Sequence, residues 1–282
     1  MAMTRAEDFR RRLEERMGSL RTGGTECATG QNAANEIAAF LTPTVEEVVQ
    51  WFEAVSSSMH VRQNEGYLAA AQATQFKCDV GDDVINAYAS RAGCGQRSYE
   101  VRFLGGALRF CRLASLAVAA DMCGRPGTAS RFAQSVDFNG GHMSAKQALE
   151  ELTGCGLDEV FRIPGVKQKA QAVCAGMIIG ILAHEMGHVC LGHALGPNYY
   201  ETNQEIGRNH EREADSFASS VTAASPFGEY VFEGTLFWYY ALAMQETDMK
   251  VATTHPLARE RLENLIRANP SKASSLGIRL PN

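Results

Sequence analysis

Several features that would indicate other classes of protein are absent from this 282-residue sequence. Its eight cysteines stand singly, without a Cys-x-x-Cys pair, so we expect reduced thiols and no cysteine-built metal site. A net charge of −5 argues against a broad nucleic-acid-binding face. The charged start of the chain is followed by no apolar segment, so we expect no secretory signal. Together these absences predict a cytoplasmic protein.

Long apolar runs are also missing. The longest run before the motif described next covers about fourteen residues, 170–183, which is short of the roughly twenty that span a bilayer. Residues 101–123 are apolar too, but Arg102, Arg109 and Arg112 interrupt them. We therefore expect no integral membrane segment. With 45% hydrophobic and 21% charged residues, the chain can instead bury a full core.

The apolar run leads into residues 184–188, which read His-Glu-Met-Gly-His. On a helix, His184 and His188 project from one face, so both imidazoles can reach one metal ion while Glu185 lies beside it. This is the HExxH pattern of zinc hydrolases, in which the glutamate is the general base. The alternative, two ordinary histidines of an amphipathic helix, is disfavoured once a third ligand is found.

Catalytic zinc usually takes three protein ligands, so a further one must come from elsewhere in the chain. The metzincin spacing is not met, because the pair Gly192-His193 is displaced from the positions it requires. Residues 209–218 instead read Asn-His-Glu-Arg-Glu-Ala-Asp-Ser-Phe-Ala. On a helix, Glu211 and Asp215 share one stripe, whereas Glu213 points roughly to the opposite side. We predict that Glu211 is the third ligand and that Asp215 accepts the outer N–H of a ligating histidine.

The combined motifs resemble a known group. HExGH, a downstream Glu-x-x-Ala-Asp-x-x-Ala and the His-Pro-x-x-x-x-Arg of residues 255–261 are similar to the HtpX-like and CAAX-prenyl-protease-like gluzincin metallopeptidases. Residues 84–89, Val-Ile-Asn-Ala-Tyr-Ala, resemble the Asn-Ala-Phe-Ala segment of that family. The match covers patches between residues 60 and 268. It implies a predominantly helical α+β fold with a zincin-like, minigluzincin-type core and a small antiparallel sheet beside the HExxH helix.

The resemblance also implies a zinc-dependent metalloendopeptidase with one Zn²⁺ per chain and a protein or peptide substrate. Zinc-activated water would attack the peptide carbonyl, with Glu185 as general base. His255 and Arg261 are candidate donors to the oxyanion, although His255 could instead begin a helix or occupy the open zinc position. The substrate would pair with an edge strand. That strand is either 99–103 or the segment formed by Asn86, Ala87, Tyr88 and Ala89.

Local patterns predict the order of the elements. Helices are expected over 7–20, 33–40, 44–57, 63–74 and 144–153, and an aromatic-rich core helix over 227–245. Strands are expected over 76–80, 84–88 and 99–103, the first two forming a hairpin or strand pair. We divide the chain into an N-terminal helical region, 1–58, and a metallopeptidase domain, 59–282. Residues 124–165 are an expected insertion that could be a lid, a partner surface or a segment without a role of its own.

Two alternatives to a peptidase stay open. One is a zinc-binding, peptidase-like regulatory or interaction protein that cleaves nothing, against which the intact Glu185 counts. The other is a protein in which the metal only stabilises the fold. Structural zinc sites usually close all four positions with cysteine and histidine, and the sequence offers no such set.

Overall fold

The computed structural model describes residues 30–42, 44–58, 65–92, 98–135, 156–194, 204–223, 228–245 and 258–270. The described elements run in the order α2 (Gly30–Leu41), α3 (Val45–Ser58), α4 (Glu65–Gln72), β1 (Thr74–Asp79), β2 (Ala87–Arg91), β3 (Tyr99–Leu104), α5 (Gly105–Met122), α6 (Thr128–Ser135), α8 (Leu157–Arg162), α9 (Val166–Cys190), α10 (Gln204–Ala223), α11 (Gly228–Gln245) and α12 (Ala258–Ala268). The fold is α+β and predominantly helical, as expected from the sequence.

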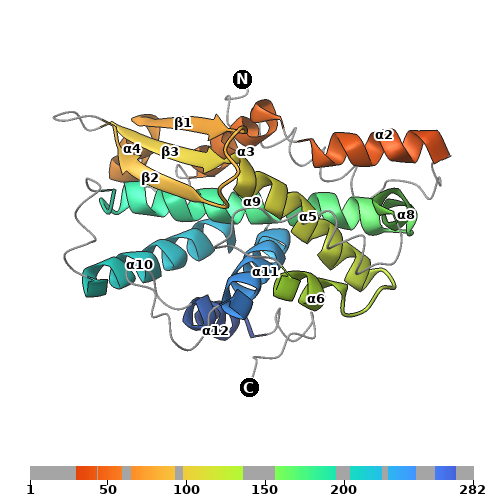
Figure 1. Ribbon diagram of the computed structural model, residues 1–282. Helices are drawn as coiled ribbons and strands as arrows, with labels where there is room; N and C mark the ends of the chain where they lie inside the picture. Colours follow the sequence, from red (N-terminus) through yellow and green to blue (C-terminus); the bar gives the residue numbers. More distant parts are fainter. Residues whose placement is uncertain are drawn as a thin grey trace, which may run out of the picture.

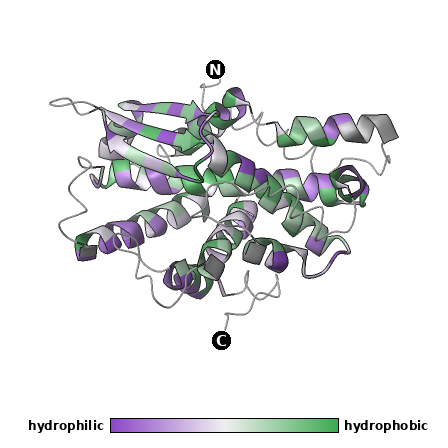
Figure 2. Ribbon diagram, in the orientation of Figure 1, coloured by the Kyte–Doolittle hydropathy of each residue, from purple (hydrophilic) through white to green (hydrophobic). Residues whose placement is uncertain are grey.

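The long helix α9 is the axis of the fold. It lies between the sheet on one side and α10, α11 and α12 on the other, while α5 crosses it (Figure 1). The apolar residues of α5 and α9 meet in the interior, and hydrophilic residues gather on α10 and α12 (Figure 2). Among the described helices, only α9 has the length and composition to cross a bilayer, and 94% of its apolar window is buried inside the protein. A helix in the core of a globular fold has the same length, composition and burial.

The sheet has three strands in the order β1-β3-β2, with β1 parallel and β2 antiparallel to β3. The expected antiparallel sheet and the expected pairing of 76–80 with 84–88 are therefore wrong, because β1 and β2 lie on opposite sides of β3. The connection between them explains the difference. This connection, residues 80–86, packs against the start of α5 and is hydrogen-bonded to it. The N–H of Gly106 donates to the carbonyl of Asp82 (2.7 Å), and Arg109 donates to the carbonyl of Val80 (3.0 Å).

Two glycines at the start of α5 allow the connection to pack this closely. A Cβ atom at Gly105 would lie 2.3 Å from the carbonyl oxygen of Val80, and one at Gly106 would lie 2.1 Å from that of Asp83. Neither contact leaves room for a side chain, so the connection can lie directly on the helix. It thereby carries the chain past β3, and β2 begins only at Ala87.

Within the described residues, β2 pairs with β3 alone and is an edge strand, whereas β3 (Tyr99–Leu104) is central. The alternative that residues 99–103 form the edge is therefore wrong. The N–H of Leu104 donates to the carbonyl of Asn86, and the N–H of Ala92 donates to that of Ser98. In an antiparallel pair such hydrogen-bonded positions alternate along the strand. The backbone groups of Ala87, Ala89 and Arg91 consequently point away from the sheet.

Helices α9 and α11 pack closely against each other at three glycines. A Cβ atom at Gly176 would lie 2.0 Å from the carbonyl oxygen of Tyr230, and one at Gly234 would lie 2.4 Å from the amide nitrogen of Met177. Gly180 faces the hydroxyl of Thr235 in the same way. Gly176, Gly180 and Gly234 thereby allow α9 and α11 to pack closely. The expected core helix over 227–245 is confirmed, as α11.

Other expected helices are found with small shifts of their ends. Residues 33–40 belong to α2 and residues 45–57 to α3. Thr44 caps the start of α3, because its hydroxyl accepts a hydrogen bond from the N–H of Glu47 (3.2 Å). The expected helix over 63–74 is α4. The described part of residues 124–165, the expected insertion, contains α6 and α8. The helices expected over 7–20 and 144–153 lie outside the described residues.

Candidate metal centre

Three buried side chains from two helices converge on one point. The Nε2 atoms of His184 and His188, both on α9, lie 3.1 Å apart. The Glu211 carboxylate of α10 faces both rings, with Oε2 3.1 Å from Nε2 of His184 and Oε1 3.3 Å from Nε2 of His188. All three ligand atoms lie within 4.8 Å of one another, so this group could hold a metal ion.

The close approach of α9 and α10 depends on small residues. A Cβ atom at Gly187 would lie 3.1 Å from the Cα atom of Ala214, which is itself fully buried. This contact brings Glu211 within reach of both histidines. Glu213 leaves the ligand group, since its side chain is 61% exposed and its Oε2 atom lies 2.9 Å from Nε2 of His193. Helical phase therefore separates the two glutamates in the structure as it does in the sequence.

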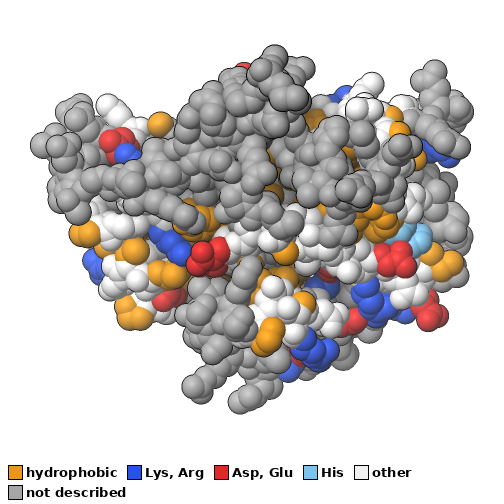
Figure 3. Space-filling model, turned by 180° about the vertical axis from the view of Figure 1, so that it is seen from behind, with side chains coloured by type: hydrophobic (Ala, Val, Ile, Leu, Met, Phe, Trp, Pro, Cys, Tyr) orange, Lys and Arg blue, Asp and Glu red, His pale blue; other side chains and the backbone are white. Residues whose placement is uncertain are grey.

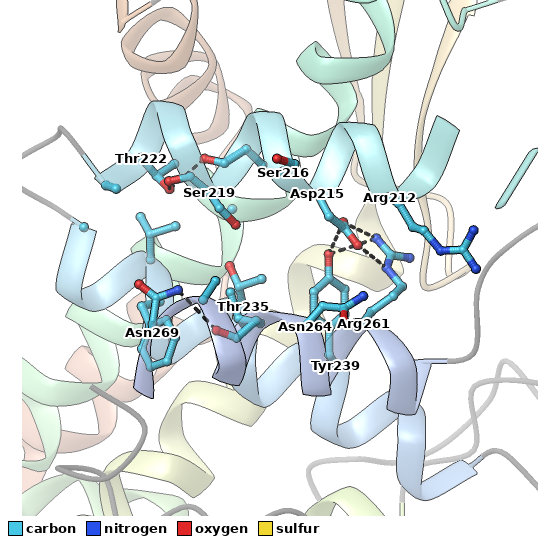
Figure 4. A pocket seen from close by; sticks show the side chains of 18 residues that line it. Arg212, Asp215, Ser216, Ser219, Thr222, Thr235, Tyr239, Arg261, Asn264 and Asn269 are labelled. Carbon is cyan, nitrogen blue, oxygen red and sulfur yellow. Dashed lines mark hydrogen bonds and ion pairs between the residues drawn. The ribbon is translucent and has the colours of Figure 1, made fainter. Parts of the chain in front are cut away.

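Asp215 lies behind His184, on the side away from the ligand group. Its Oδ1 atom is 2.8 Å from Nδ1 of His184, and Arg261 of α12 donates to both of its oxygens (2.7 and 2.8 Å). Tyr239 of α11 donates its hydroxyl proton to Oδ1 (2.5 Å). Figure 4 shows Asp215, Tyr239 and Arg261 pointing toward one another from three different helices.

These contacts fix the protonation of the pair. Burial alone would raise the pKa of Asp215, but the Arg261 charge and the His184 hydrogen bond lower it well below its usual range. Asp215 is therefore a carboxylate and accepts the N–H from Nδ1 of His184. Because Nδ1 keeps its proton for Asp215, Nε2 is the nitrogen that can give up its own proton and present a lone pair to a metal ion, as it does in zinc sites where a carboxylate orients the ligating histidine.

The electrostatics of the group favour a cation. Burial opposes the charge of Glu211, yet hydrogen bonds from the two imidazoles outweigh it and hold the Glu211 pKa far below its usual range. Burial likewise opposes protonation of His184, but hydrogen bonds to Asp215 and Glu211 raise the His184 pKa to about 10. A buried carboxylate between two imidazole nitrogens therefore attracts positive charge strongly. Two imidazoles and one carboxylate in this arrangement fit a bound metal ion.

Glu185 lies beside the ligand group without belonging to it. Burial raises its pKa to about 7, although His184 and a hydrogen bond from the backbone N–H of Ala89 act in the opposite direction. That N–H belongs to the outward-pointing set of β2, so the edge strand lies directly against Glu185. A carboxyl group with a pKa near neutrality can both accept and release a proton.

Two further histidines lie next to the centre. The rings of His193 and His210 stack in parallel with centroids 3.9 Å apart, and His193 lies 5.5 Å from the ring of His188. His193 does not join the ligand group. The sequence analysis did not single out His210. Among the described histidines, it alone is not buried. The rear surface of the molecule shows a histidine side chain beside acidic side chains (Figure 3).

The structure places Arg261 behind His184. Its guanidinium is buried and donates hydrogen bonds to Asp215 and Tyr239. Its Nη1 atom lies 3.6 Å from Oε2 of Glu211. Its expected contact with the oxyanion stays a prediction. His255, the other expected donor, lies outside the described residues. Tyr239 was missed, because its sequence neighbours carry no motif and it reaches Asp215 only through the fold.

A cavity of about 310 Å³ lies between α10, α11 and α12, at the rear of the centre (Figure 4). Its wall includes Asp215, Tyr239 and Arg261, but none of the three ligand residues lines it. This cavity therefore reaches the network that orients His184 and not the face of the centre where a substrate would meet the metal.

No protein-family model matches the chain, and neither does any curated protein or solved structure. The resemblance to gluzincins therefore depends on the motifs and on the geometry described above.

Proposed function

We propose that this protein is a zinc-dependent metalloendopeptidase of the gluzincin type, with a zincin-like core. The observation that carries the proposal is the buried convergence of His184, His188 and Glu211 with Glu185 beside them. Two imidazoles and one carboxylate are a typical protein ligand set of catalytic zinc, which keeps a further position open. Calcium and magnesium prefer all-oxygen ligands, so the two imidazole nitrogens favour zinc.

Zinc at this site would polarise a peptide carbonyl and lower the pKa of a water molecule toward neutrality. Glu185 accepts the proton of that water as the water attacks the carbonyl carbon, and then delivers it to the leaving amine nitrogen. Asp215 holds His184 in the tautomer that leaves Nε2 available. Arg261 keeps Asp215 ionised and thereby preserves this orientation.

The edge strand offers a way to align the substrate. Because the backbone groups of Ala87 and Arg91 and the carbonyl of Ala89 point away from β3, an extended peptide can pair with them as an additional strand. The N–H of Ala89 already meets Glu185, so a peptide bound along β2 would have its backbone beside the general base. Main-chain pairing gives affinity with little dependence on side chains, which suits a protein or peptide substrate.

The test compares wild type with Glu185→Gln and with Glu213→Gln, the same change at an exposed glutamate nearby. Zinc content is measured alongside cleavage of a diverse peptide library. We expect wild type and both variants to carry one zinc per chain. Cleavage should fall by about 10²- to 10⁴-fold in Glu185→Gln alone, because the general base is lost.

Two results would overturn the proposal. Undiminished cleavage by Glu185→Gln would show that any hydrolysis comes from another site or a contaminant. Tight zinc binding with no cleavage by wild type across the library would instead support the zinc-binding regulatory protein.

A further inference from the structure

Tyr239 lies next to the metal centre but belongs to none of the sequence motifs. It lies on α11, whereas the proposed ligands lie on α9 and α10. Its ring is buried, its hydroxyl is 2.5 Å from Oδ1 of Asp215, and the guanidinium of Arg261 lies over its ring at 4.4 Å. The network behind His184 therefore includes a third helix besides α10 and α12.

The direction of the Tyr239 hydroxyl is determined by its neighbours. Arg261 has only donors, and its Nη2 atom donates to the Tyr239 oxygen (2.8 Å). The single hydroxyl proton must then point to Asp215, which accepts it. Oδ1 of Asp215 thus receives donors from His184, Tyr239 and Arg261 at once. Each of these contacts limits the rotation of the carboxylate that orients His184.

The backbone holds Tyr239 in place relative to His184. The contacts of Gly176 with Tyr230, and of Gly234 with Met177, are so close that α11 cannot slide along α9 without a collision. His184 follows two turns after Gly176 on α9, and Tyr239 follows little more than one turn after Gly234 on α11. The packing of these two helices consequently fixes the distance between the hydroxyl and the metal centre.

We propose that Tyr239 is a positioning residue of the metal centre: its hydroxyl holds Asp215, and through Asp215 the imidazole of His184, in the orientation that binds the metal. This inference rests on the proposed metal site. Tyr239 touches neither substrate nor metal in this role. Its contribution is a smaller rotational freedom of a ligating histidine, which zinc sites obtain from partners of their ligands.

The test measures zinc affinity of the full chain by competition with a chromophoric chelator. Tyr239→Phe keeps the ring and removes only the hydroxyl. The matched control is Tyr240→Phe, at the neighbouring tyrosine of α11, whose ring lies near Phe237; among the described residues, the hydrogen bonds of Asp215 and Arg261 go to Tyr239 and not to Tyr240. We expect zinc affinity to fall about tenfold in Tyr239→Phe and to stay unchanged in Tyr240→Phe.

A double-mutant cycle separates positioning from general packing. If Tyr239 acts through Asp215, its substitution should have little further effect in an Asp215→Asn background. The visible spectrum of the Co²⁺-loaded protein should change in Tyr239→Phe, because the His184 ligand is less constrained, and stay unchanged in Tyr240→Phe. Equal zinc affinity of Tyr239→Phe and wild type, or additive losses in the cycle, would overturn this inference alone. Absence of zinc binding by wild type would overturn the proposed metal site as well.

Discussion

The imidazole of His184 is held at both nitrogens by two carboxylates of one helix: Asp215 lies 2.8 Å from Nδ1, and Glu211 lies 3.1 Å from Nε2. The two acids are one helical turn apart on α10, so both project from the same face of the helix toward His184. One carboxylate faces the side where the histidine donates, and the other faces the side where a metal would bind. The geometry gives the two acids different roles although they belong to the same stripe.

The first prediction concerns the choice of third ligand. Glu211→Ala should weaken zinc binding by at least about 10²-fold, because one of three ligand side chains is removed from a buried site. Glu213→Ala should bind zinc as wild type does, since the Glu213 side chain is 61% exposed and faces His193. Zinc titration of both variants measures the difference. Loss of zinc from Glu213→Ala together with retention by Glu211→Ala would reverse the assignment.

Much of the centre could be predicted from the sequence because its parts repeat at helical spacing. His184 and His188, like Glu211 and Asp215, are four residues apart, so local helix geometry places each pair on one face. The contact between the two helices depends on the small residues Gly187 and Ala214. What local geometry could not supply was Tyr239, whose place depends on how α11 crosses α9.

The pairing of the strands in the sheet also could not be predicted from local sequence patterns. The strand over 99–103 and most of β1 could be predicted from alternation, but the partners of each strand could not. A short connection between two strand-like segments normally predicts a hairpin. Here Gly105, Gly106 and Arg109 of the following helix bind the connection, and β3 inserts between β1 and β2. These contacts join residues that are more than twenty positions apart, so no local pattern reports them.

A second prediction compares two arginines that are each paired with an acid. Arg261 is 9% exposed and pairs with Asp215, whereas Arg212 and its partner Glu260 are 41% and 38% exposed. Arg261→Met should reduce the free energy of unfolding by about 3 kcal/mol, because it leaves the largely buried carboxylate of Asp215, whose side chain is 20% exposed, without its main partner. Arg212→Met should cost at most about 1 kcal/mol.

Urea unfolding in the presence of a chelator measures both changes without a contribution from metal binding. Similar losses in the two variants would show that burial does not distinguish the pairs. A stable Arg261→Met protein would mean that Asp215 is satisfied by Tyr239 and His184 alone.

A third prediction addresses the packing of α9 against α11. In an open helix, Gly→Ala stabilises by about 1 kcal/mol. At Gly176 the added methyl group would lie 2.0 Å from the carbonyl oxygen of Tyr230, so the two helices must separate. We expect Gly176→Ala to lose about 1–3 kcal/mol of stability, as overpacked cores do. Gly81→Ala is the control, since its Cβ atom would meet only Asp79 at 3.6 Å, and its change should stay within about 0.5 kcal/mol. Chemical denaturation checks both, and a Gly176→Ala protein more stable than wild type would contradict the close contact.

The last prediction uses the alternation of backbone groups along β2. Ala87 is the first residue of the strand and its N–H points away from β3, so Ala87→Pro removes a group that would pair with a substrate and spares the sheet. Tyr88→Pro instead removes a backbone group that faces Arg102 of β3. Ala87→Pro should therefore lower kcat/KM for peptides by about 5- to 10-fold, the equivalent of one hydrogen bond, with a stability change within about 1 kcal/mol.

Tyr88→Pro should destabilise the fold by about 1–3 kcal/mol, because the Arg102 backbone loses a partner inside the sheet. Thermal unfolding and peptide kinetics on the same two preparations separate the effects. If Ala87→Pro unfolds as readily as Tyr88→Pro, the assigned alternation is incorrect. If Ala87→Pro is stable and cleaves peptides at the wild-type rate, the substrate does not pair with the N–H of Ala87, and the alignment of peptides along β2 loses its main support.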